Sequence, residues 1–213
     1  MPIKLDEKTL NKVKEYFARL ESNVVIYYAI DDEEGERGEF SRMVEEILKL
    51  LSGLSNKLTA IKMNESLEHE FNIDKRPAIV IHGKDKYNIR YFGVPAGYEF
   101  GVIIEDIVYA SKGTPDLPKE VLLKLREINE KVHIQVFVTP TCPYCPIAAK
   151  AAHMYAIANL NITSDVVEVS EFPELAEKYN IFAVPKIVIN DKVEVEGAIP
   201  HEFFIEKILE AIS

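Results

Sequence analysis

The chain has 213 residues, of which 47% are hydrophobic, and its formal net charge is −10 at pH 7. It is long enough to bury a sizeable core, as one large domain or two small ones, and its acidity argues against nucleic acid as a partner because phosphate binding needs a basic face. No apolar run approaches the roughly 20 residues of a membrane span, and the N-terminus has no hydrophobic stretch typical of a signal peptide. We therefore expect an intracellular, cytoplasmic protein with no membrane partner.

Hydrophobic periodicity predicts alternating helices and strands in the first half of the chain. Within 40–51, apolar residues recur at spacings of three and four, as on one face of a helix. Short apolar runs bounded by turn residues predict strands. The predicted elements are a helix at 8–19, a strand at 24–29, a helix at 40–51, a strand at 58–63, a short helix at 66–71, hairpin strands at 78–81 and 89–92, and a helix at 98–108.

The second half is predicted to follow the same order after a linker. Residues 111–118 (SKGTPDLP) have linker composition, so we place two domains at 1–112 and 113–213. The predicted elements of the second domain are a helix at 119–128, a strand at 134–138, a helix at 147–160, a strand at 165–169, a short helix at 173–179, hairpin strands at 186–189 and 193–195, and a helix at 201–212.

The two halves share an internal repeat. Residues 71–81 (FNIDKRPAIVI) align without a gap with 179–189 (YNIFAVPKIVI) at an offset of 108, and six of the eleven positions are identical. Because such self-similarity indicates a repeated structural unit, we predict a tandem duplication. The predicted fold is α/β, with two tandem units that are each a mixed β-sheet flanked by helices in the order β-α-β-α-β-β-α.

The only two cysteines, Cys142 and Cys145, lie three positions apart between a predicted strand and a predicted helix. The first turn of a helix offers unpaired N–H groups and the positive end of the helix dipole. Both favour a thiolate, so we expect the pKa of Cys142 to be lowered into the range of roughly 3.5–7.5. Cys145 would then lie close enough to resolve a mixed disulfide on Cys142.

Two other interpretations of the cysteine pair are less favoured. A zinc site needs about four ligands, and the five histidines are scattered without His-x3-5-His spacing. A structural disulfide would close a tiny loop and constrain little of the unfolded chain. We expect a redox-active disulfide between Cys142 and Cys145, with no metal and no cofactor.

The second half resembles a domain of the thioredoxin/glutaredoxin type. The resemblance rests on Cys142-Pro143-Tyr144-Cys145, on Ala183-Val184-Pro185 and on Gly197. Nearly the whole chain is similar to the protein disulfide oxidoreductases of hyperthermophiles, which are built from two thioredoxin-like units. The resemblance implies a thermophilic source and a thiol–disulfide oxidoreductase that acts on protein disulfides.

The same resemblance implies roles for residues around the dithiol. Pro143 would occupy the first turn of the helix, and Tyr144 would shape the rim of the substrate-binding site. Val184–Pro185 would be a cis peptide bond beside the dithiol, where the backbone of Val184 offers an edge to an extended substrate segment. A plain strand-entry proline is the alternative for Pro185.

The sequence departs from the family pattern in the first unit. An offset of 108 carries the cysteines back onto Glu34 and Arg37, so this unit is expected to be redox-inactive. We interpret the acidic run at 31–39 as a solvated loop, with a docking patch for a basic partner as the alternative. The stretch at 196–200 (EGAIP) lacks the two glycines and Asp of the glutaredoxin glutathione signature, which disfavours glutathione as the specific partner.

Two further residues have more than one interpretation. Glu168 is the candidate proton acceptor for Cys145, because the strand before the dithiol holds only apolar residues where thioredoxins place an Asp. The alternation Val167-Glu168-Val169 instead favours an exposed strand residue. His153, eight residues after Cys145, is interpreted as a surface or packing residue.

Three functions remain open from the sequence. The leading one is a general protein disulfide oxidoreductase, with a thioredoxin-reductase-like flavoprotein as electron donor. The second is an electron-transfer adaptor between such a flavoprotein and a peroxiredoxin, which the single dithiol favours. The third is a binding or chaperone-like module with an incidental dithiol. The sequence does not indicate whether the protein reduces, forms or isomerises disulfides.

Overall fold

The computed structural model describes residues 5–31 and 34–213. The start of the chain used for the signal-peptide prediction (1–4) and part of the acidic run (32–33) lie outside the described residues. The first half contains α1 (Glu7–Phe17), β1 (Val24–Ala29), α2 (Glu36–Ser52), β2 (Leu58–Lys62), α3 (Glu65–Glu70), β3 (Ala78–His82), β4 (Ile89–Phe92), the 3-10 turn η1 (Gly97–Glu99) and α4 (Phe100–Lys112).

The second half contains α5 (Lys119–Arg126), β5 (Val132–Val138), α6 (Cys145–Ala158), β6 (Ile162–Glu168), the 3-10 turn η2 (Val169–Glu171), α7 (Pro173–Lys178), β7 (Lys186–Ile189), β8 (Val193–Glu196) and α8 (His201–Ile212). The predicted order of helices and strands is confirmed, and η2 is an addition. The division at 112/113 stays a prediction.

The predicted end of α4 is wrong by four residues. The helix continues to Lys112 and ends at Gly113, which adopts a left-handed conformation (φ 69°). Ser111 lies in a buried last turn, where its hydroxyl accepts hydrogen bonds from the backbone N–H groups of Glu21 and Ser22 (2.6 and 2.9 Å). The polar composition that suggested a linker therefore belongs partly to a packed helix end.

All eight strands form one mixed sheet in the order β2-β1-β3-β4-β6-β5-β7-β8. In the first group, β1 pairs parallel with β2 and antiparallel with β3, which pairs antiparallel with β4. The second group repeats this pattern with β5, β6, β7 and β8. The α/β prediction is confirmed, but the sequence did not predict that β4 pairs in parallel with β6 and joins the two groups edge to edge. The join satisfies two strand edges that would otherwise have unpaired backbone groups.

The offset of 108 residues relates local structure in the two halves as well as sequence. Asn72 and Asn180 both adopt left-handed conformations (φ 51° and 49°). The peptide bonds before Pro77 and Pro185 are both cis. Equivalent sequence positions therefore adopt equivalent backbone conformations.

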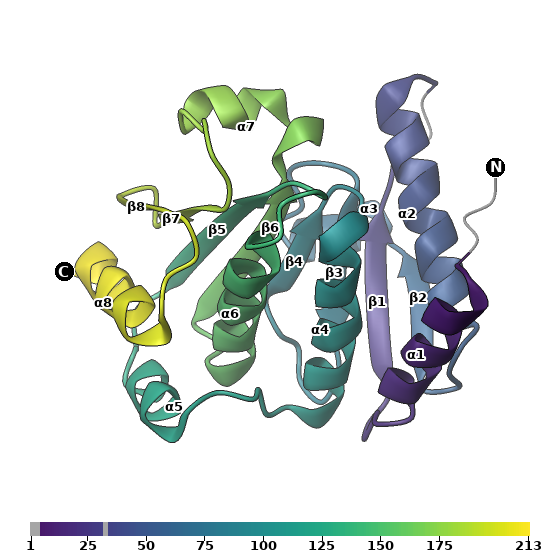
Figure 1. Cartoon of the computed structure of the whole chain (residues 1–213), viewed down its shortest axis with the longest axis horizontal. Coiled ribbons are helices and arrows are strands. Elements are labelled where there is room, and N and C mark those ends of the chain that lie inside the picture. The colour runs from purple at the N-terminus through teal and green to yellow at the C-terminus, as the bar shows by residue number, and fades with distance from the viewer. Residues whose placement is uncertain (1–4, 32–33) are drawn as a thin grey trace.

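The two faces of the sheet are covered unequally. The larger apolar core contains buried residues of α1, α2, α4, α5, α6 and α8, whereas the smaller core on the other face is closed by residues of α3 and α7. Helices α4 and α6 pack side by side across the middle of the sheet, one from each half (Figure 1). The buried face of α6 is rich in alanine, which lets the helices approach closely. Within the described ranges, none of the helices has the length and apolarity needed to cross a bilayer.

Candidate functional site

Cys142 and Cys145 form a disulfide at the start of α6. Strand β5 ends at Val138, a short loop follows, and Cys145 is the first residue of the helix. The two sulfurs are bonded, and the Cα atoms of the two cysteines lie 5.5 Å apart. Cys142 is 9% exposed whereas Cys145 is fully buried, so an incoming partner reaches Cys142 first.

The helix start is oriented to stabilise a thiolate on Cys142. The backbone N–H of Cys145 donates a hydrogen bond to Cys142 Sγ at 3.1 Å. Among the described residues, no side chain at the N-cap position caps this helix end, so the positive end of the dipole faces the sulfur. The prediction for Pro143 is wrong in detail: Pro146 occupies the first turn, and Pro143 lies in the exposed turn before the helix.

The backbone before Pro185 lies beside the dithiol. The Val184–Pro185 peptide bond is cis, as the resemblance implied, and Cys142 Sγ lies 3.6 Å from the Val184 carbonyl oxygen. Two aromatic side chains are exposed close in sequence to these groups. Tyr144, between the two cysteines, is 66% exposed, and Phe182, shortly before Pro185, is 92% exposed. The structure therefore brings Tyr144, Val184 and Pro185 into one region with Cys142.

The equivalent position of the first half is arranged differently. Arg76–Pro77 is also a cis peptide bond. The Arg76 guanidinium, however, forms ion pairs with Glu68 and Asp31. This place in the first half therefore holds a charged cluster instead of a dithiol.

The favoured interpretation of Glu168 as an exposed residue is wrong. Glu168 is 2% exposed at the end of β6, a central strand whose neighbours β4 and β5 cover both its edges. It is aligned with Val138 at the end of β5. Its carboxylate accepts hydrogen bonds from the backbone N–H groups of Ser170 and Glu171 (3.3 and 3.1 Å), so it caps η2.

A second buried glutamate, Glu99, was not anticipated from the sequence. It is fully buried, and neither carboxylate oxygen has a hydrogen-bond partner among the residues that the structure describes. Burial raises the pKa of Glu99 to about 8, because the ionised carboxylate loses its hydration without gaining hydrogen bonds. A signal was present: Glu99 and Asp106 fall on the apolar stripe that also contains Val102 and Ile103.

Glu99 belongs to the segment of the first half that contacts the dithiol loop. Turn η1 packs against α6. The backbone N–H of Tyr98 donates a hydrogen bond to the Pro140 carbonyl oxygen at 3.0 Å. Gly97 approaches the same carbonyl so closely that an added Cβ would lie 2.2 Å from its oxygen.

Glu171 of η2 forms a hydrogen bond with the segment that precedes η1. Its carboxylate accepts a hydrogen bond from the Val94 N–H at 2.8 Å. Burial, with the nearby Glu168 carboxylate, raises the pKa of Glu171 to about 7. The buried Tyr91 hydroxyl lies in the field of these acids and has no hydrogen-bond partner within 5–31 and 34–213.

His153 is a buried residue of α6, so the packing alternative is confirmed and the surface alternative is wrong. It is 1% exposed, and its Nδ1 lies 2.6 Å from Asp106 Oδ2.

On the opposite face of the sheet, Arg90 of β4 forms a bidentate ion pair with the buried Asp165 of β6 (2.6 and 2.8 Å). Burial opposes ionisation of Asp165, but a hydrogen bond from His133 and the charge of Arg90 hold its pKa at about 2.

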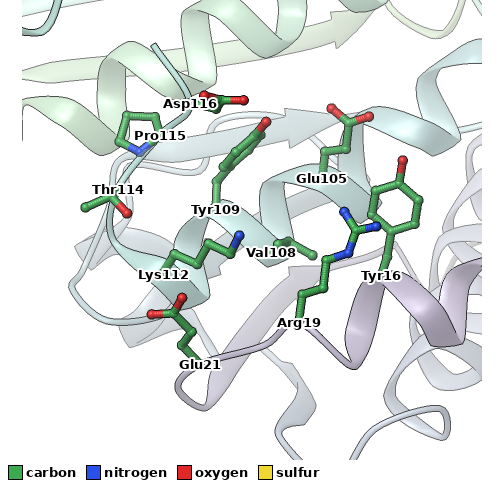
Figure 2. A pocket seen from close by; sticks show the side chains of 10 residues that line it. All are labelled: Tyr16, Arg19, Glu21, Glu105, Val108, Tyr109, Lys112, Thr114, Pro115 and Asp116. Atoms are coloured by element: carbon green, nitrogen blue, oxygen red, sulfur yellow. The ribbon is translucent and has the colours of Figure 1, made fainter. Parts of the chain in front are cut away.

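A surface cavity lies away from the dithiol. It is a cavity of about 590 Å³ that opens between α1, α4 and the segment after α4 (Figure 2). Tyr16, Arg19, Glu105, Tyr109 and Lys112 are among the residues that line it. Its lining contains none of the predicted site residues. In the part of the chain that the structure describes, no three His, Cys, Asp or Glu side chains are grouped so that they could hold a metal ion.

Comparisons with known proteins agree on the fold. A family model described as "Thioredoxin domain" matches residues 132–210. The chain is 22% identical over 204 residues to a Bacillus subtilis protein named NADH dehydrogenase, covering 96% of this chain and 38% of that protein. It is also 22% identical over 197 residues to the alkyl hydroperoxide reductase protein AhpF of Staphylococcus aureus, covering 92% and 36%. The chain thus spans less than two fifths of the curated relatives that it matches.

Two solved structures resemble almost the entire chain. The C503A mutant of AhpF from Enterococcus faecalis superposes with a TM-score of 0.88 at 23% identity, covering 96% of this chain and 99% of that one. A protein disulfide oxidoreductase from Aeropyrum pernix superposes with a TM-score of 0.85 at 27% identity, covering 97% and 93%. The chain therefore has a thioredoxin-like fold that carries a Cys-x-x-Cys disulfide.

Proposed function

We propose that the protein is a thiol–disulfide oxidoreductase that acts on protein disulfides through Cys142 and Cys145. One observation carries the proposal: the disulfide joins a nearly buried Cys142 to a fully buried Cys145 at a helix N-terminus, with the Val184 carbonyl 3.6 Å from Cys142 Sγ. This arrangement gives the two sulfurs different roles. The likeness to the Aeropyrum pernix protein supports the same activity class.

The reaction is an exchange of two disulfide bonds. In the reduced protein, the Cys142 thiolate attacks one sulfur of the partner disulfide, a mixed disulfide forms, and the other partner sulfur leaves as a thiolate. Cys145 then loses its proton and attacks Cys142 Sγ. The Cys142–Cys145 bond forms, the second partner thiolate is released, and two electrons have passed from the dithiol to the partner.

We assign Glu99 as the proton acceptor for Cys145, because its buried carboxylate has no hydrogen-bond partner among the described residues and belongs to η1, which packs against α6. A useful base has a pKa near that of the group from which it takes the proton, and the pKa of Glu99 (about 8) is close to that of an ordinary thiol, roughly 8.5. Glu168, the candidate acceptor from the sequence, already accepts two backbone hydrogen bonds and therefore acts as the cap of η2. In this assignment, the redox-inactive first half supplies the proton-accepting side chain to the dithiol of the second half.

The partner segment binds beside the cis proline. The backbone of Val184 pairs with an extended stretch of the substrate. Tyr144 and Phe182 supply exposed apolar contacts, and Pro143 and Pro185 shape the backbone around them. Main-chain pairing makes this recognition tolerant of substrate sequence, as a general oxidoreductase requires.

A second function has its own support. The matches to AhpF, and the single dithiol in the second half, favour an adaptor that carries electrons from a thioredoxin-reductase-like flavoprotein to a peroxiredoxin. The cysteine chemistry is the same in both cases, and only the partners differ. A cytoplasmic location and a thermophilic source fit either function and remain predictions.

A trapping experiment tests the proposal. Cys145→Ser should accumulate mixed disulfides on Cys142 when incubated with oxidised insulin or an oxidised peroxiredoxin, and Cys142→Ser is the matched control that should trap neither. The wild-type protein should reduce insulin with dithiothreitol. Turnover only with a flavoprotein and peroxiredoxin pair would favour the adaptor, and failure of Cys145→Ser to trap any partner would refute both.

A further inference from the structure

The buried pair Asp106–His153 joins the two halves at the α4–α6 interface. Each side chain is 1% exposed, and His153 Nδ1 lies 2.6 Å from Asp106 Oδ2. His153 Nε2 lies 3.2 Å from the carbonyl oxygen of Arg90 in β4. A carbonyl oxygen can only accept a hydrogen bond, so Nε2 carries a hydrogen. Burial raises the pKa of Asp106, but where Asp106 is ionised its carboxylate accepts a second hydrogen from Nδ1, and the ring is then an imidazolium.

This pair lies in the same interface as the proposed proton-transfer groups. Asp106 of α4 follows Glu99 of η1 by seven residues, and His153 follows Cys145 by eight residues in α6, so each pair of positions is about two helical turns apart. Helices α4 and α6 pack side by side, and η1 also contacts α6 (Figure 1). Turn η1, which holds Glu99, is hydrogen-bonded to the loop that leads to the dithiol, and the Asp106–His153 pair lies farther along α4 and α6.

The electrostatics of the interface connect these groups. Burial acts to lower the pKa of His153, but the Asp106 carboxylate raises it above its ordinary value. Burial raises the pKa of Glu99. The charge of His153 lowers this pKa more than any other charge does, and the charge of Asp106 raises it by a smaller amount. The other ionisable groups that act on these three residues come from several packed elements: Tyr91, Glu105, Lys150, Asp165 and Glu168.

We propose that Asp106 holds His153 as an imidazolium, and that this buried positive charge keeps Glu99 ionised beforehand, so that its carboxylate can accept the proton that Cys145 gives up and become the neutral acid. His153 and Asp106 are positioning residues, because they act through Glu99 and touch no reacting sulfur. The proposal rests on the proposed function, in which Glu99 accepts the proton of Cys145. It assigns a purpose to a charged pair that would otherwise be costly to bury.

The charge of His153 can be measured in the wild-type protein. In ¹⁵N NMR spectra of the imidazole groups, both ring nitrogens of His153 should be protonated at pH 7, because Asp106 raises the pKa of His153. The exposed His69 of α3 is the internal reference for the imidazole signals. A neutral His153 at pH 7 would overturn the proposal without any variant having to fold.

The consequence for Glu99 is tested with His153→Asn, and His69→Asn is the matched control. A ¹³C NMR titration of the Glu99 carboxyl should give a pKa that is higher in His153→Asn by about one unit, as expected for the loss of one charge at short range in a protein interior. His69→Asn should leave the Glu99 pKa unchanged. An unchanged pKa in His153→Asn would overturn the proposal.

A kinetic measurement separates this inference from the proposed function. The reduced protein is mixed with 5,5′-dithiobis(2-nitrobenzoate), and the second release of thionitrobenzoate reports the attack of Cys145 on the mixed disulfide at Cys142. In His153→Asn, the pH profile of this step should move upward by the same amount as the Glu99 pKa. If Glu99→Gln alters the step but His153→Asn does not, the inference alone fails. If Glu99→Gln leaves the step unchanged, Glu99 is not the acceptor and both proposals about it fail.

Discussion

Replacing Gly97 by alanine tests the close contact between the two halves. Gly97 has φ 58°, and a Cβ at this position would lie 2.2 Å from the Pro140 carbonyl oxygen and 2.9 Å from the carbonyl carbon. Alanine in a left-handed conformation costs about 1–2 kcal/mol. Forcing extra volume against backbone that cannot rotate away adds about 1–3 kcal/mol. The expected loss in free energy of unfolding is therefore about 2–5 kcal/mol.

Gly197→Ala is the matched control, because Gly197 also has a positive φ (83°) but no atom of the described chain within 4 Å of an added Cβ. It should lose only the conformational part, about 1–2 kcal/mol. Urea unfolding of the oxidised proteins measures both losses. Because the clash displaces the loop that leads to Cys142, Gly97→Ala should also change the alkylation rate of the reduced Cys142. Equal losses in the two variants would refute the argument that Gly97 is required by its contact with Pro140.

The buried charges and the exposed rim allow three more tests. Arg90→Met should lower the free energy of unfolding in urea by about 3–5 kcal/mol, because it leaves the buried charge of Asp165 without the Arg90 ion pair. Lys86→Met removes an exposed ion pair and should lower it by less than about 0.5 kcal/mol. Between pH 4.5 and 8 the folded state binds more protons at Glu99 than the unfolded state does, because burial raises the pKa of Glu99 from 4.5 to about 8, so this group makes stability fall as the pH rises. Glu99→Gln should therefore gain stability relative to the wild type as the pH rises through this window, by about 5 kcal/mol at pH 9, which lies above both pKa values. Phe182→Ala should raise the KM for a protein disulfide roughly fivefold to tenfold, and should leave reduction of the dithiol by dithiothreitol unchanged because the side chain is 92% exposed.

Each of these predictions has a contradicting result. Equal effects of Arg90→Met and Lys86→Met would show that burial of the Asp165 pair contributes nothing beyond a surface ion pair. A stability difference between Glu99→Gln and the wild type that does not change with pH would contradict the raised pKa of Glu99. A slower reaction of Phe182→Ala with dithiothreitol would mean that the substitution disturbs the dithiol itself.

The repeat and the dithiol could be predicted because each depends on a short stretch of chain. The Cys142–Cys145 pair between an apolar run and a helical run was sufficient to predict a disulfide at a helix start. The sequence around Pro185 resembles that around Pro77, and the peptide bonds before both prolines are cis. The roles of these residues in catalysis and substrate binding remain predictions.

The burial of the charged side chains could not be predicted from local patterns. The alternation around Glu168 suggested a half-solvated strand, but pairing of β6 with both β4 and β5 buries it. Glu99 and His153 lie in different halves of the chain, at the interface that α6 forms with η1 and α4. Their ionisation depends on that burial, so neither could be assigned a role before the packing of α4 against α6 was known.

Local patterns in the amino-acid sequence were enough to establish the order of helices and strands and the place of the dithiol, because hydrophobic periodicity, turn residues and cysteine spacing act over a few residues. The pairing of β4 with β6, which turns two four-stranded groups into one eight-stranded sheet, became visible only in three dimensions. The tertiary structure alone also showed which charged side chains are buried away from water. That outcome depends on surfaces contributed by segments far apart in the chain, and no local pattern records it.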